Sequence, residues 1–318
     1  MSYRVAINGL GRIGRSVLRA WFERPVGPPL ELVALNELAD IQTLAHLTRY
    51  DSTHGKFSGS VAVEGQHLVV NGCRMAVSHT PDIAELPWRE LGVDLVLECT
   101  GAFSDRSAAM VHLQQGAQRV LFSQPAEPDV DATIVYGVNH QSLRPEHRIV
   151  SNASCTTNCI VPVIQVLNEA FGIEHGVITT IHSAMNDQPV IDAYHHTDLR
   201  KTRSAFQSII PVDTGLARGI DRLLPALAGR FEAQAMRVPV VNVSAMDLTV
   251  MLQTGSSREA VNALFREAAT RFPPGVLGWT DEPLASCDFN HDTRSAIVDL
   301  SQTRLSGDRL LKVLVWFD

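Results

Sequence analysis

The 318-residue sequence predicts an α/β protein with two domains, a domain built on a parallel sheet followed by an α+β domain with a mainly antiparallel sheet. Short apolar runs alternate with helical patterns in the first half, which is typical of β-α-β units on a parallel sheet. After residue 151 the runs lengthen and alternate apolar with polar residues, which is typical of a sheet with one covered face. We therefore expect one domain over residues 1–153 and a second over residues 154–318.

The expected elements follow from the spacing of the apolar residues. In the first domain, strands are expected over residues 3–8, 30–36, 93–99 and 118–123, and helices over residues 13–24, 40–50 and 105–117. In the second domain, a helix is expected over residues 155–171, ended by Gly172, and strands over residues 176–183, 232–240 and 241–253. The polar segment 184–208 has no clear pattern, and such a long segment inside a compact domain is usually functional or at an interface.

The bulk composition excludes several classes of protein. Hydrophobic residues make up 45% of the chain and charged residues 19%, the usual balance of a soluble globular protein. The net charge of −7, without a dense Lys or Arg run, argues against a nucleic-acid partner and gives no indication of a membrane surface. No stretch of about 18 apolar residues occurs, and the first residues show no signal-peptide pattern. We therefore expect a cytoplasmic protein.

The cysteine content also agrees with a cytoplasmic location. Five cysteines, an odd number, do not suggest a disulfide framework, so we expect free thiols. Cys155 and Cys159 lack a second close pair of Cys or His residues, so no metal site is expected.

The stretch "INGLGRIGR" contains Gly9, Gly11 and Gly14 in GxGxxG spacing, after an expected strand and at the opening of an expected helix. Such glycines permit a tight turn and let the backbone approach a pyrophosphate, whose charge suits a helix N-terminus. The alternative is a turn that only packs a helix on a sheet. Glu37, at the end of the second strand, can accept ribose hydroxyls and repels a 2′-phosphate. Strand, helix and carboxylate together favour a Rossmann-type domain that binds NAD rather than NADP.

The stretch "SNASCTTNC" places Cys155 at the start of an expected helix. Free backbone N–H groups and the helix dipole stabilise a thiolate there, so we expect a lowered pKa and a nucleophilic role. Cys159 lies one turn further on, beside apolar residues, and is expected to be packed. A cysteine at a helix start can also be purely structural, and a catalytic role requires a base.

His182 is the candidate base among the 12 histidines, because it ends a strand-like run directly before segment 184–208. A histidine at such a strand end can point into a cleft and pair with a thiol. The alternative is a hydrogen-bonded histidine at a sheet edge.

Cationic side chains that could hold a phosphorylated substrate are Arg200, Lys201, Arg203 and Arg237. Arg237 is an isolated charge in an apolar strand pattern, and a buried unpaired charge is costly. We therefore expect it to meet an anion, either a protein carboxylate or a substrate phosphate.

Seven stretches carry a family resemblance: "INGLGRIGR", "YDSTHGKF", "SNASCTTNC", "TTIHS", "SIIPVDTG", "MRVPVVNVSAMDLTV" and "DFNHDTRSAIVD". They resemble the phosphorylated-aldose dehydrogenases of the glyceraldehyde-3-phosphate dehydrogenase superfamily, in the family's order and over nearly the whole chain. Within that superfamily, "NELAD", "IHSAMNDQPVIDAYH", "PVDTGLA" and "NHDTRSAIVDLSQTRLSG" are more similar to the D-erythrose-4-phosphate dehydrogenases.

The resemblance implies a covalent mechanism. Cys155 attacks the substrate aldehyde to give a thiohemiacetal, and His182 lowers the thiol pKa and transfers protons. Hydride transfer to NAD leaves a thioester. In the erythrose branch, water releases 4-phosphoerythronate, on the route to pyridoxal phosphate. The resemblance also implies a homotetramer with residues 184–208 at an interface, and a continuation beyond Asp318 with an Asn-Glu-Trp-Gly motif and a long helix.

Further residues match the family's binding positions. The implied cofactor contacts are Gly9, Gly11, Arg12, Ile13, Gly14, Glu37, Thr100 and Ser123, and the implied substrate contacts are Ser154, Thr156, Lys201, Thr214, Gly215 and Arg237. Two positions depart from the glycolytic pattern. Met185 stands where a threonine typically contacts a phosphate, and Lys201 stands where an arginine is common.

Two other functions stay open. The first is a phosphorylating glyceraldehyde-3-phosphate dehydrogenase, against which Met185 counts. The second is a catalytically silent NAD-binding protein, which would have no need of a reactive thiol beside an imidazole. The acidic balance gives no support to RNA binding.

Overall fold

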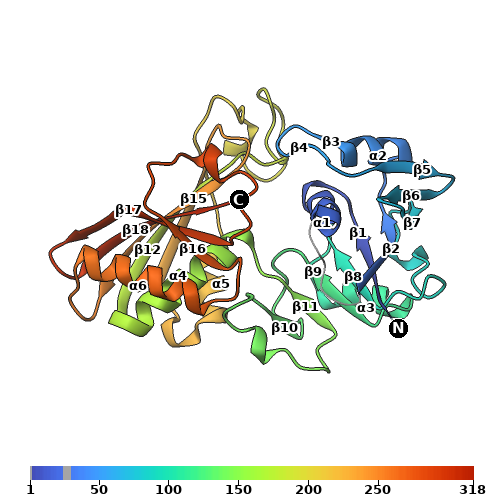
Figure 1. The fold of residues 1–318 in the computed structure, drawn as a ribbon. Helices are drawn as coiled ribbons and strands as arrows, with labels where there is room; N and C mark the ends of the chain where they lie inside the picture. The colour runs from blue at the N-terminus through green and yellow to red at the C-terminus, as the bar shows by residue number, and fades with distance from the viewer. Residues whose placement is uncertain (1, 24–29) are drawn as a thin grey trace. The chain divides into compact units, whose positions relative to one another are not determined.

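The computed structural model describes residues 2–23 and 30–318 and divides into two compact units. The first unit contains the described residues up to Ile134 together with Gln141–Ser154, and the second contains Val135–His140 and Cys155–Asp318. Each unit has its own large sheet (Figure 1). The functional domain limits at residues 153 and 154 stay a prediction.

The sheet of the first unit contains, within the described residues, nine strands in the order β10-β11-β9-β8-β1-β2-β7-β6-β5. Neighbours from β10 to β7 are parallel, and β6 and β5 extend the edge in antiparallel fashion. The strands are β1 Tyr3–Asn8, β2 Leu30–Asn36, β5 Val61–Glu64, β6 His67–Val70, β7 Cys73–Ser78, β8 Leu95–Glu98, β9 Arg119–Phe122, β10 Ala132–Thr133 and β11 Ile149–Ser151. Because β1 lies between β2 and β8, the strand order reverses its direction at β1. In parallel sheets, ligands bind at such a reversal, just beyond the carboxyl ends of the strands.

Three helices accompany this sheet in the described residues: α1 Arg12–Glu23, α2 Ile41–Arg49 and α3 Arg106–Gln114. Asp40 caps α2 by accepting the N–H groups of Gln42 and Thr43, and Asp105 caps α3 through the N–H of Ala108. Each helix therefore begins one residue later than expected, because the capping aspartate stays outside it; α2 also ends one residue before its expected end, and α3 ends three residues before. Residue 24 of the expected first helix lies outside the described residues. The antiparallel edge β5–β7 was not expected from the sequence.

The second sheet contains seven strands over residues 155–318, in the order β13-β14-β12-β15-β18-β17-β16. Only β12–β14 and β16–β17 are parallel pairs, so the sheet is mainly antiparallel and the predicted fold class is confirmed. The strands are β12 Ile173–His182, β13 Ile210–Val212, β14 Phe231–Arg237, β15 Ser244–Leu252, β16 Leu277–Thr280, β17 Ala296–Ser306 and β18 Leu310–Phe317. Figure 1 shows the helices α4 Cys155–Phe171, α5 Leu216–Leu223 and α6 Arg258–Arg271 on the same side of this sheet.

Helix α4 has the predicted bounds, and its apolar face is fully buried at Ile160, Val163, Ile164 and Leu167. Gly172 ends it with a left-handed φ of +66°.

Strands β8 and β9 are one or two residues shorter at their ends than predicted, and two expected strands of the second sheet are shortened for local backbone reasons. The run expected over 232–240 ends at Arg237, and Pro239 lacks the N–H needed to continue a ladder. The run expected over 241–253 begins only at Ser244, because Val243 has a φ of +61°.

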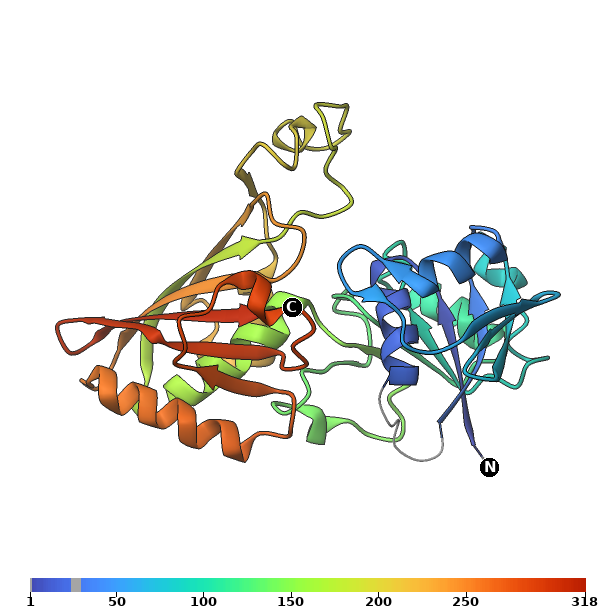
Figure 2. The same ribbon diagram turned by 45° about the horizontal axis from the view of Figure 1, so that its top comes forward.

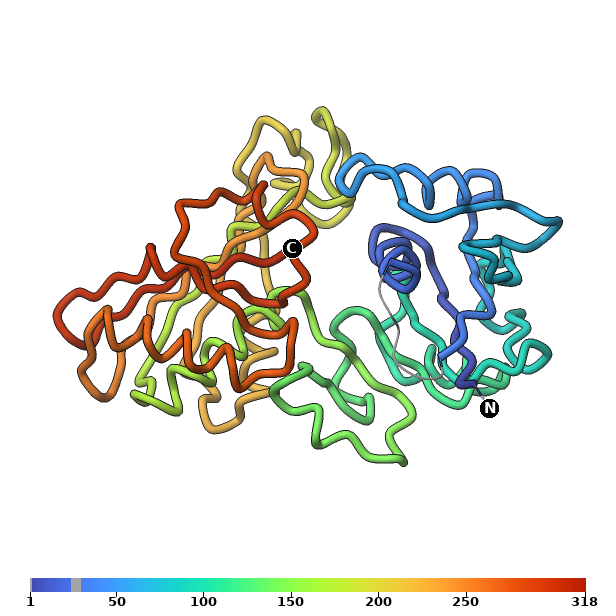
Figure 3. Tube along the Cα trace, in the orientation of Figure 1, coloured from blue at the N-terminus to red at the C-terminus, as the bar shows by residue number. Residues whose placement is uncertain are grey.

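Segment 184–208 contains only the short 3₁₀ helix Arg200–Thr202, and Figure 2 shows it projecting from the end of the second sheet. Helices α5 and α6 and strands β16–β18 were not expected from the sequence. Strands β17 and β18 form a hairpin, which turns at Gly307 with a φ of +66°; the dark red trace folds back on itself there in Figure 3.

Candidate active site

Cys155 and His182 lie together in the second unit. Cys155 is the first residue of α4, and His182 is the last residue of β12. The Cys155 Sγ is 3.9 Å from Nε2 of His182, a long contact for a thiol and an imidazole. The ring of Phe317, at the end of β18, stands edge-on to the imidazole with 6.3 Å between centroids. The structure therefore brings the two predicted residues into reach of one another.

The pKa of the Cys155 thiol is raised in this arrangement, contrary to our expectation from the sequence. The residue is exposed, but the protein around Sγ removes solvation, and this raises the pKa. The backbone N–H groups of Thr156 and Cys155 and the charge of Arg237 lower the pKa, without reversing the effect. A thiolate at this position therefore depends on a base as well as on the helix start.

The second thiol has a different environment. Cys159 is fully buried, and burial raises its pKa well above the usual value. Such a thiol is inert, as the sequence predicted for a packed cysteine.

Arg237 is the last residue of β14 and is paired directly with His182 in the register of the parallel strands. Its Nη1 is 2.6 Å from Nδ1 of His182, and its buried Nε has no hydrogen-bond partner among the described residues. Within the same residues, Arg237 forms no ion pair with a carboxylate, although Asp187 is near enough to act on its charge. Of the two anions expected for Arg237, the protein carboxylate is therefore not found at ion-pair distance.

Burial lowers the pKa of His182, and the charge of Arg237 lowers it further. The carbonyl of Ser183 and the carboxylate of Asp187 act in the opposite direction. The imidazole is therefore neutral at neutral pH.

Lys201 is not a free cation, because its Nζ is 2.9 Å from Oδ2 of Asp187. Burial raises the pKa of Asp187, but Lys201 and Arg237 lower this pKa by more, so that it lies below its ordinary value. Arg203 likewise pairs with Asp192 at 2.9 Å. Asp187 was missed in the sequence, where it stands five residues after His182 in a segment without a regular pattern.

Thr214 and Gly215 precede α5, and Gly215 is its N-cap residue. The first turn of α5 packs on the first turn of α4, since a Cβ at Gly219 would lie 3.2 Å from Oγ1 of Thr157. Two helix starts, both suited to anions, are thus neighbours. Ser154 and Thr156 flank Cys155 along the chain, and both have polar partners in the structure.

The glycine-rich turn of the first unit fits a dinucleotide. Gly9 has a φ of +87°, and a Cβ there would lie 2.7 Å from the backbone of Thr100. A Cβ at Gly14 would lie 2.0 Å from the carbonyl oxygen of Gly9, so this glycine lets α1 pack closely on the turn. At Gly11, in contrast, a Cβ would meet no atom within 4 Å, which leaves the backbone open to a pyrophosphate. Ile13, in the first turn of α1, is 54% exposed.

Charged side chains brace this turn. The carboxylate of Glu37 accepts the N–H groups of Leu10 at 2.7 Å and Leu38 at 2.8 Å. Arg12 forms an ion pair with Asp51. Burial alone would raise the pKa of Asp51. This pKa is nevertheless lowered to about 2 by hydrogen bonds from the N–H groups of His54 and Thr53 and by the Arg12 guanidinium.

A buried polar network lies under Thr100. The Oε1 of Glu98 accepts the N–H of Thr100 at 2.9 Å and also its hydroxyl, and Oε2 accepts the amide of Asn8 at 2.6 Å. His112 Nε2 lies 3.1 Å from the same Oε2, while its Nδ1 accepts the indole N–H of Trp88 at 3.0 Å. This fixes His112 as the neutral tautomer that donates to Glu98. Glu98 was missed in the sequence, although it is a lone charge in an apolar strand, as Arg237 is.

Ser123, the second predicted contact in this region, donates its backbone N–H to the carbonyl of Glu98 at 3.0 Å. Its side chain bonds the thiol of Cys99, whose pKa is raised by burial to about 11.

Comparison with known families agrees with this geometry. Residues 3–106 match the glyceraldehyde 3-phosphate dehydrogenase NAD binding domain, and residues 154–318 match the glyceraldehyde 3-phosphate dehydrogenase C-terminal domain. This chain belongs to the glyceraldehyde 3-phosphate dehydrogenase family. As a family member it uses NAD, and its domains are those of NAD-dependent oxidoreductases that act on the aldehyde group of a phosphorylated aldose.

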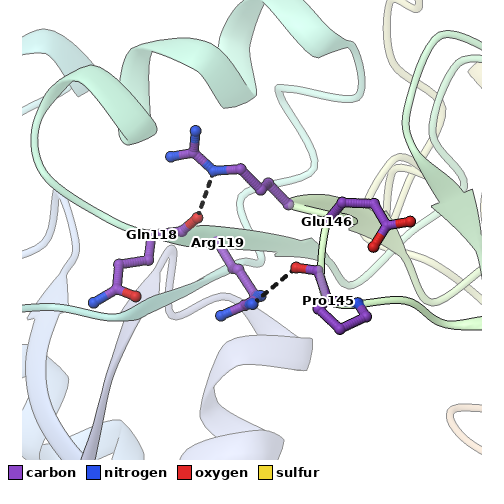
Figure 4. Close-up of a pocket in the computed structure, with 5 residues that line it drawn as sticks. Gln118, Arg119, Pro145 and Glu146 are labelled. Atoms are coloured by element: carbon purple, nitrogen blue, oxygen red, sulfur yellow. Dashed lines mark hydrogen bonds between the residues drawn. The ribbon is translucent and has the colours of Figure 1, made fainter.

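A shallow hollow elsewhere on the first unit of this glyceraldehyde 3-phosphate dehydrogenase family member contains none of the predicted site residues. It is lined by Gln118, Arg119, Pro145, Glu146 and Arg148 (Figure 4). Its two guanidinium groups are engaged by backbone carbonyls, Arg119 with Pro145 and Arg148 with Gln118, each at 3.0 Å. These bonds give the arginines a structural role.

Over residues 2–23 and 30–318, no helix is both long and apolar enough to cross a membrane. The same stretches contain no cluster of three His, Cys, Asp or Glu side chains suited to a metal ion.

Proposed function

We propose that this chain oxidises D-erythrose 4-phosphate to 4-phosphoerythronate with NAD as the oxidant. The observation that carries the proposal is the 3.9 Å approach of the Cys155 Sγ to Nε2 of His182 beside a cation, Arg237, that forms no ion pair among the described residues. A nucleophile, a base and an anion-binding group are the elements that oxidation of a phosphorylated aldehyde needs.

In the first step the Cys155 thiol gives its proton to Nε2 of His182, and Sγ bonds to the aldehyde carbon. The carbonyl oxygen becomes an alkoxide, which the N–H of Cys155 at the helix start can stabilise and which the imidazolium protonates. The result is a thiohemiacetal.

His182 then removes the hydroxyl proton as the carbonyl re-forms and the carbon gives up a hydride. NAD, when bound, would supply the hydride acceptor. Its pyrophosphate would be held by Gly9, Gly11, Gly14, Arg12 and Ile13, its ribose by Glu37, and the rest of the dinucleotide by Thr100 and Ser123. The substrate is left on Cys155 as a thioester. The imidazolium of His182 first releases its proton to solvent. The neutral ring then takes a proton from a water molecule as the water oxygen bonds to the thioester carbon, and the Cys155 thiolate leaves and recovers that proton from His182.

The anion contacts are assigned to Ser154, Thr156, Thr214, Gly215 and Arg237, with Lys201 nearby. Arg237 offers an unpartnered donor, and the neighbouring starts of α4 and α5 offer N–H groups. Lys201 is already neutralised by Asp187, so its contribution to anion binding is weaker than that of Arg237.

The choice of water over phosphate rests on the segment that follows β12. Met185 brings a thioether where glycolytic relatives typically place a hydroxyl. The loss of that hydrogen-bond donor disfavours a second anion beside the substrate phosphate, which leaves water as the acceptor. The product fits the route to pyridoxal phosphate biosynthesis.

The decisive experiment is NADH formation from erythrose 4-phosphate and NAD in phosphate-free buffer, with glyceraldehyde 3-phosphate as the parallel substrate. We expect turnover of the four-carbon sugar without phosphate, and a Met185→Thr variant that gains a response to added phosphate. Turnover of the three-carbon sugar alone, and only with phosphate, would establish the phosphorylating alternative. Binding of NAD without turnover of either sugar would establish the silent NAD-binding alternative.

We also propose a homotetramer in the cytoplasm. The face of the second sheet opposite its helices exposes Val177 and Ile181, at 58% and 37%, and the segment after β12 exposes Ile191 and Tyr194 at 77% and 88%. Apolar patches of this kind mark protein interfaces. Light scattering on the purified chain tests this assembly, and a monomeric mass at micromolar concentration would contradict it.

A further inference from the structure

Two groups compete for one nitrogen of His182. Nδ1 lies 2.6 Å from Nη1 of Arg237 and 2.8 Å from the carbonyl oxygen of Ser183. The same Arg237 nitrogen is 3.5 Å from that carbonyl. An imidazole nitrogen has a single in-plane position, occupied either by a proton or by a lone pair. Only one of the two contacts is therefore a hydrogen bond at any time.

The two possibilities have opposite consequences for Cys155. If Arg237 donates to Nδ1, the neutral ring carries its proton on Nε2, which faces Sγ, and the ring has no lone pair for the thiol proton. If Nδ1–H donates to Ser183, Nε2 carries the lone pair and can accept that proton. Ser183 is itself held in place, because its N–H donates to Oγ of Ser244 at 3.1 Å.

We propose that Arg237 is a positioning residue that sets the tautomer of His182 and releases it when an anion binds. In the free chain the Arg237 Nη1–H holds Nδ1, and the proton of the ring lies on Nε2. An anionic substrate group draws the guanidinium away, the ring loses its Nε2 proton to water and gains one at Nδ1, and Nδ1–H donates to Ser183. The base at Nε2 is then formed only when substrate is present. This inference rests on the proposed function for its anion.

The surroundings of Arg237 support its release. Its buried Nε has no partner among the described residues, so an anion that takes the Nη1–H from Nδ1 of His182 can also satisfy a donor that is otherwise unpaired. The charged groups that act on the imidazole are Arg237 on β14 and Asp187 after β12, and the thiol of Cys155 faces it from α4. Phe317 on β18 presents an uncharged ring edge. Withdrawal of Arg237 is thus the change that frees Nδ1.

The experiment measures alkylation of Cys155 by iodoacetamide at pH 6–8, with and without inorganic phosphate at constant ionic strength. We expect phosphate to accelerate alkylation by roughly threefold to tenfold at neutral pH, because the freed imidazole takes the thiol proton. In the Arg237→Met variant, alkylation of Cys155 should be fast without phosphate, and added phosphate should not change its rate. Arg258→Gln removes an exposed arginine at the start of α6 and should behave like the wild type.

A purely electrostatic role of Arg237 predicts the opposite effect on the alkylation rate of Cys155. If Arg237 acted only as a charge that stabilises the thiolate, phosphate and the Arg237→Met change would both slow alkylation. Slowing in either case overturns the proposal.

A second measurement does not depend on a variant. The ¹⁵N shifts of labelled histidine, with His182 assigned through His182→Gln, should show Nδ1 unprotonated in the free chain and protonated with phosphate; an unchanged tautomer overturns the proposal. Neither measurement uses NAD or a sugar, so the two proposals can fail separately. If phosphate accelerates alkylation of Cys155 but erythrose 4-phosphate is not turned over, the proposed substrate is rejected and the control of the His182 tautomer by Arg237 is retained.

Discussion

His182 and Arg237 occupy matching positions at the ends of two neighbouring parallel strands, β12 and β14. Because parallel neighbours end at the same sheet edge, one edge supplies both the imidazole and the guanidinium, and α4 brings the Cys155 thiol to them. A slip of one residue in this register would turn one of the two side chains to the other face of the sheet. The pairing of these strands is therefore a requirement for the site.

The two cysteines of α4 should respond very differently to substitution. Cys155→Ser removes the nucleophile and is expected to lower kcat/KM by about 10³-fold or more, with little effect on folding. Cys159→Ser places a hydroxyl at a fully buried position and should instead cost about 1–2 kcal/mol of unfolding free energy while activity is kept. NADH formation and urea denaturation separate the two effects. Equal losses of activity in both variants would contradict the assignment.

The pH dependence should report His182. Its pKa is lowered by burial and by Arg237 from an ordinary value of 6.5, so the base is unprotonated at neutral pH. The rate is therefore expected to be level near pH 7 and to fall only as the pH drops below 6.5 and the imidazole is protonated. His182→Asn should lose about 10²- to 10⁴-fold in kcat/KM and lose this acid limb. An acid limb that persists in His182→Asn would assign it to another group.

Gly11 and Gly14 form a matched pair for the cofactor turn. Gly14→Ala forces a Cβ to 2.0 Å from the Gly9 carbonyl oxygen and should destabilise the chain by about 1–3 kcal/mol. Gly11→Ala meets no atom within 4 Å, so stability should stay within about 0.5 kcal/mol of the wild type while NAD binding weakens. Thermal unfolding and NAD titration measure the two quantities. Unchanged NAD affinity in Gly11→Ala would mean that the pyrophosphate lies elsewhere.

Glu98→Gln tests the buried network under Thr100. The substitution turns one acceptor into a donor. In one orientation the new NH2 group faces the amide of Asn8 and the Nε2–H of His112, and in the other it faces the N–H of Thr100. We expect a loss of about 2–4 kcal/mol in unfolding free energy and a raised KM for NAD, because the position of Thr100 depends on Glu98. Glu31→Gln, at a side chain 51% exposed, is the control and should change stability by less than about 0.5 kcal/mol. A stable Glu98→Gln chain with normal KM would remove the network from the cofactor site.

Local signals explain what the sequence could predict of the fold. The bounds of α4 follow from its apolar face and from Gly172, and β2 follows from an apolar run that Glu31 interrupts. The antiparallel edge β5–β7 was missed because its short strands lie between glycine turns and are stabilised by pairing with one another. The left-handed backbone at Val243 was also not predictable, since a β-branched residue rarely adopts it.

Part of the candidate site could likewise be predicted from local signals in the sequence, and part of it could not. Cys155 and His182 were suggested by their positions at the end of a predicted helix and a predicted strand, and Arg237 by being an isolated charge within a predicted strand. The 2.6 Å contact between Arg237 and His182 depends on strand register, and the ion pair of Lys201 with Asp187 depends on an irregular segment. Neither has a local sequence pattern. The raised pKa of Cys155 depends on the packing around Sγ, which the helix-start argument did not include.

The place of β18 in its sheet has a consequence for synthesis on the ribosome. The first unit completes its sheet once Ile149–Ser151 have emerged, so it can fold during translation. In the second unit, β18 lies between β15 and β17, and Phe317 pairs with Ser244. That sheet cannot close before residues 310–317 have left the exit tunnel, and its long sequence separations slow the closure further. Until then β15 exposes an open edge, and this is the period in which the nascent chain is most prone to aggregate.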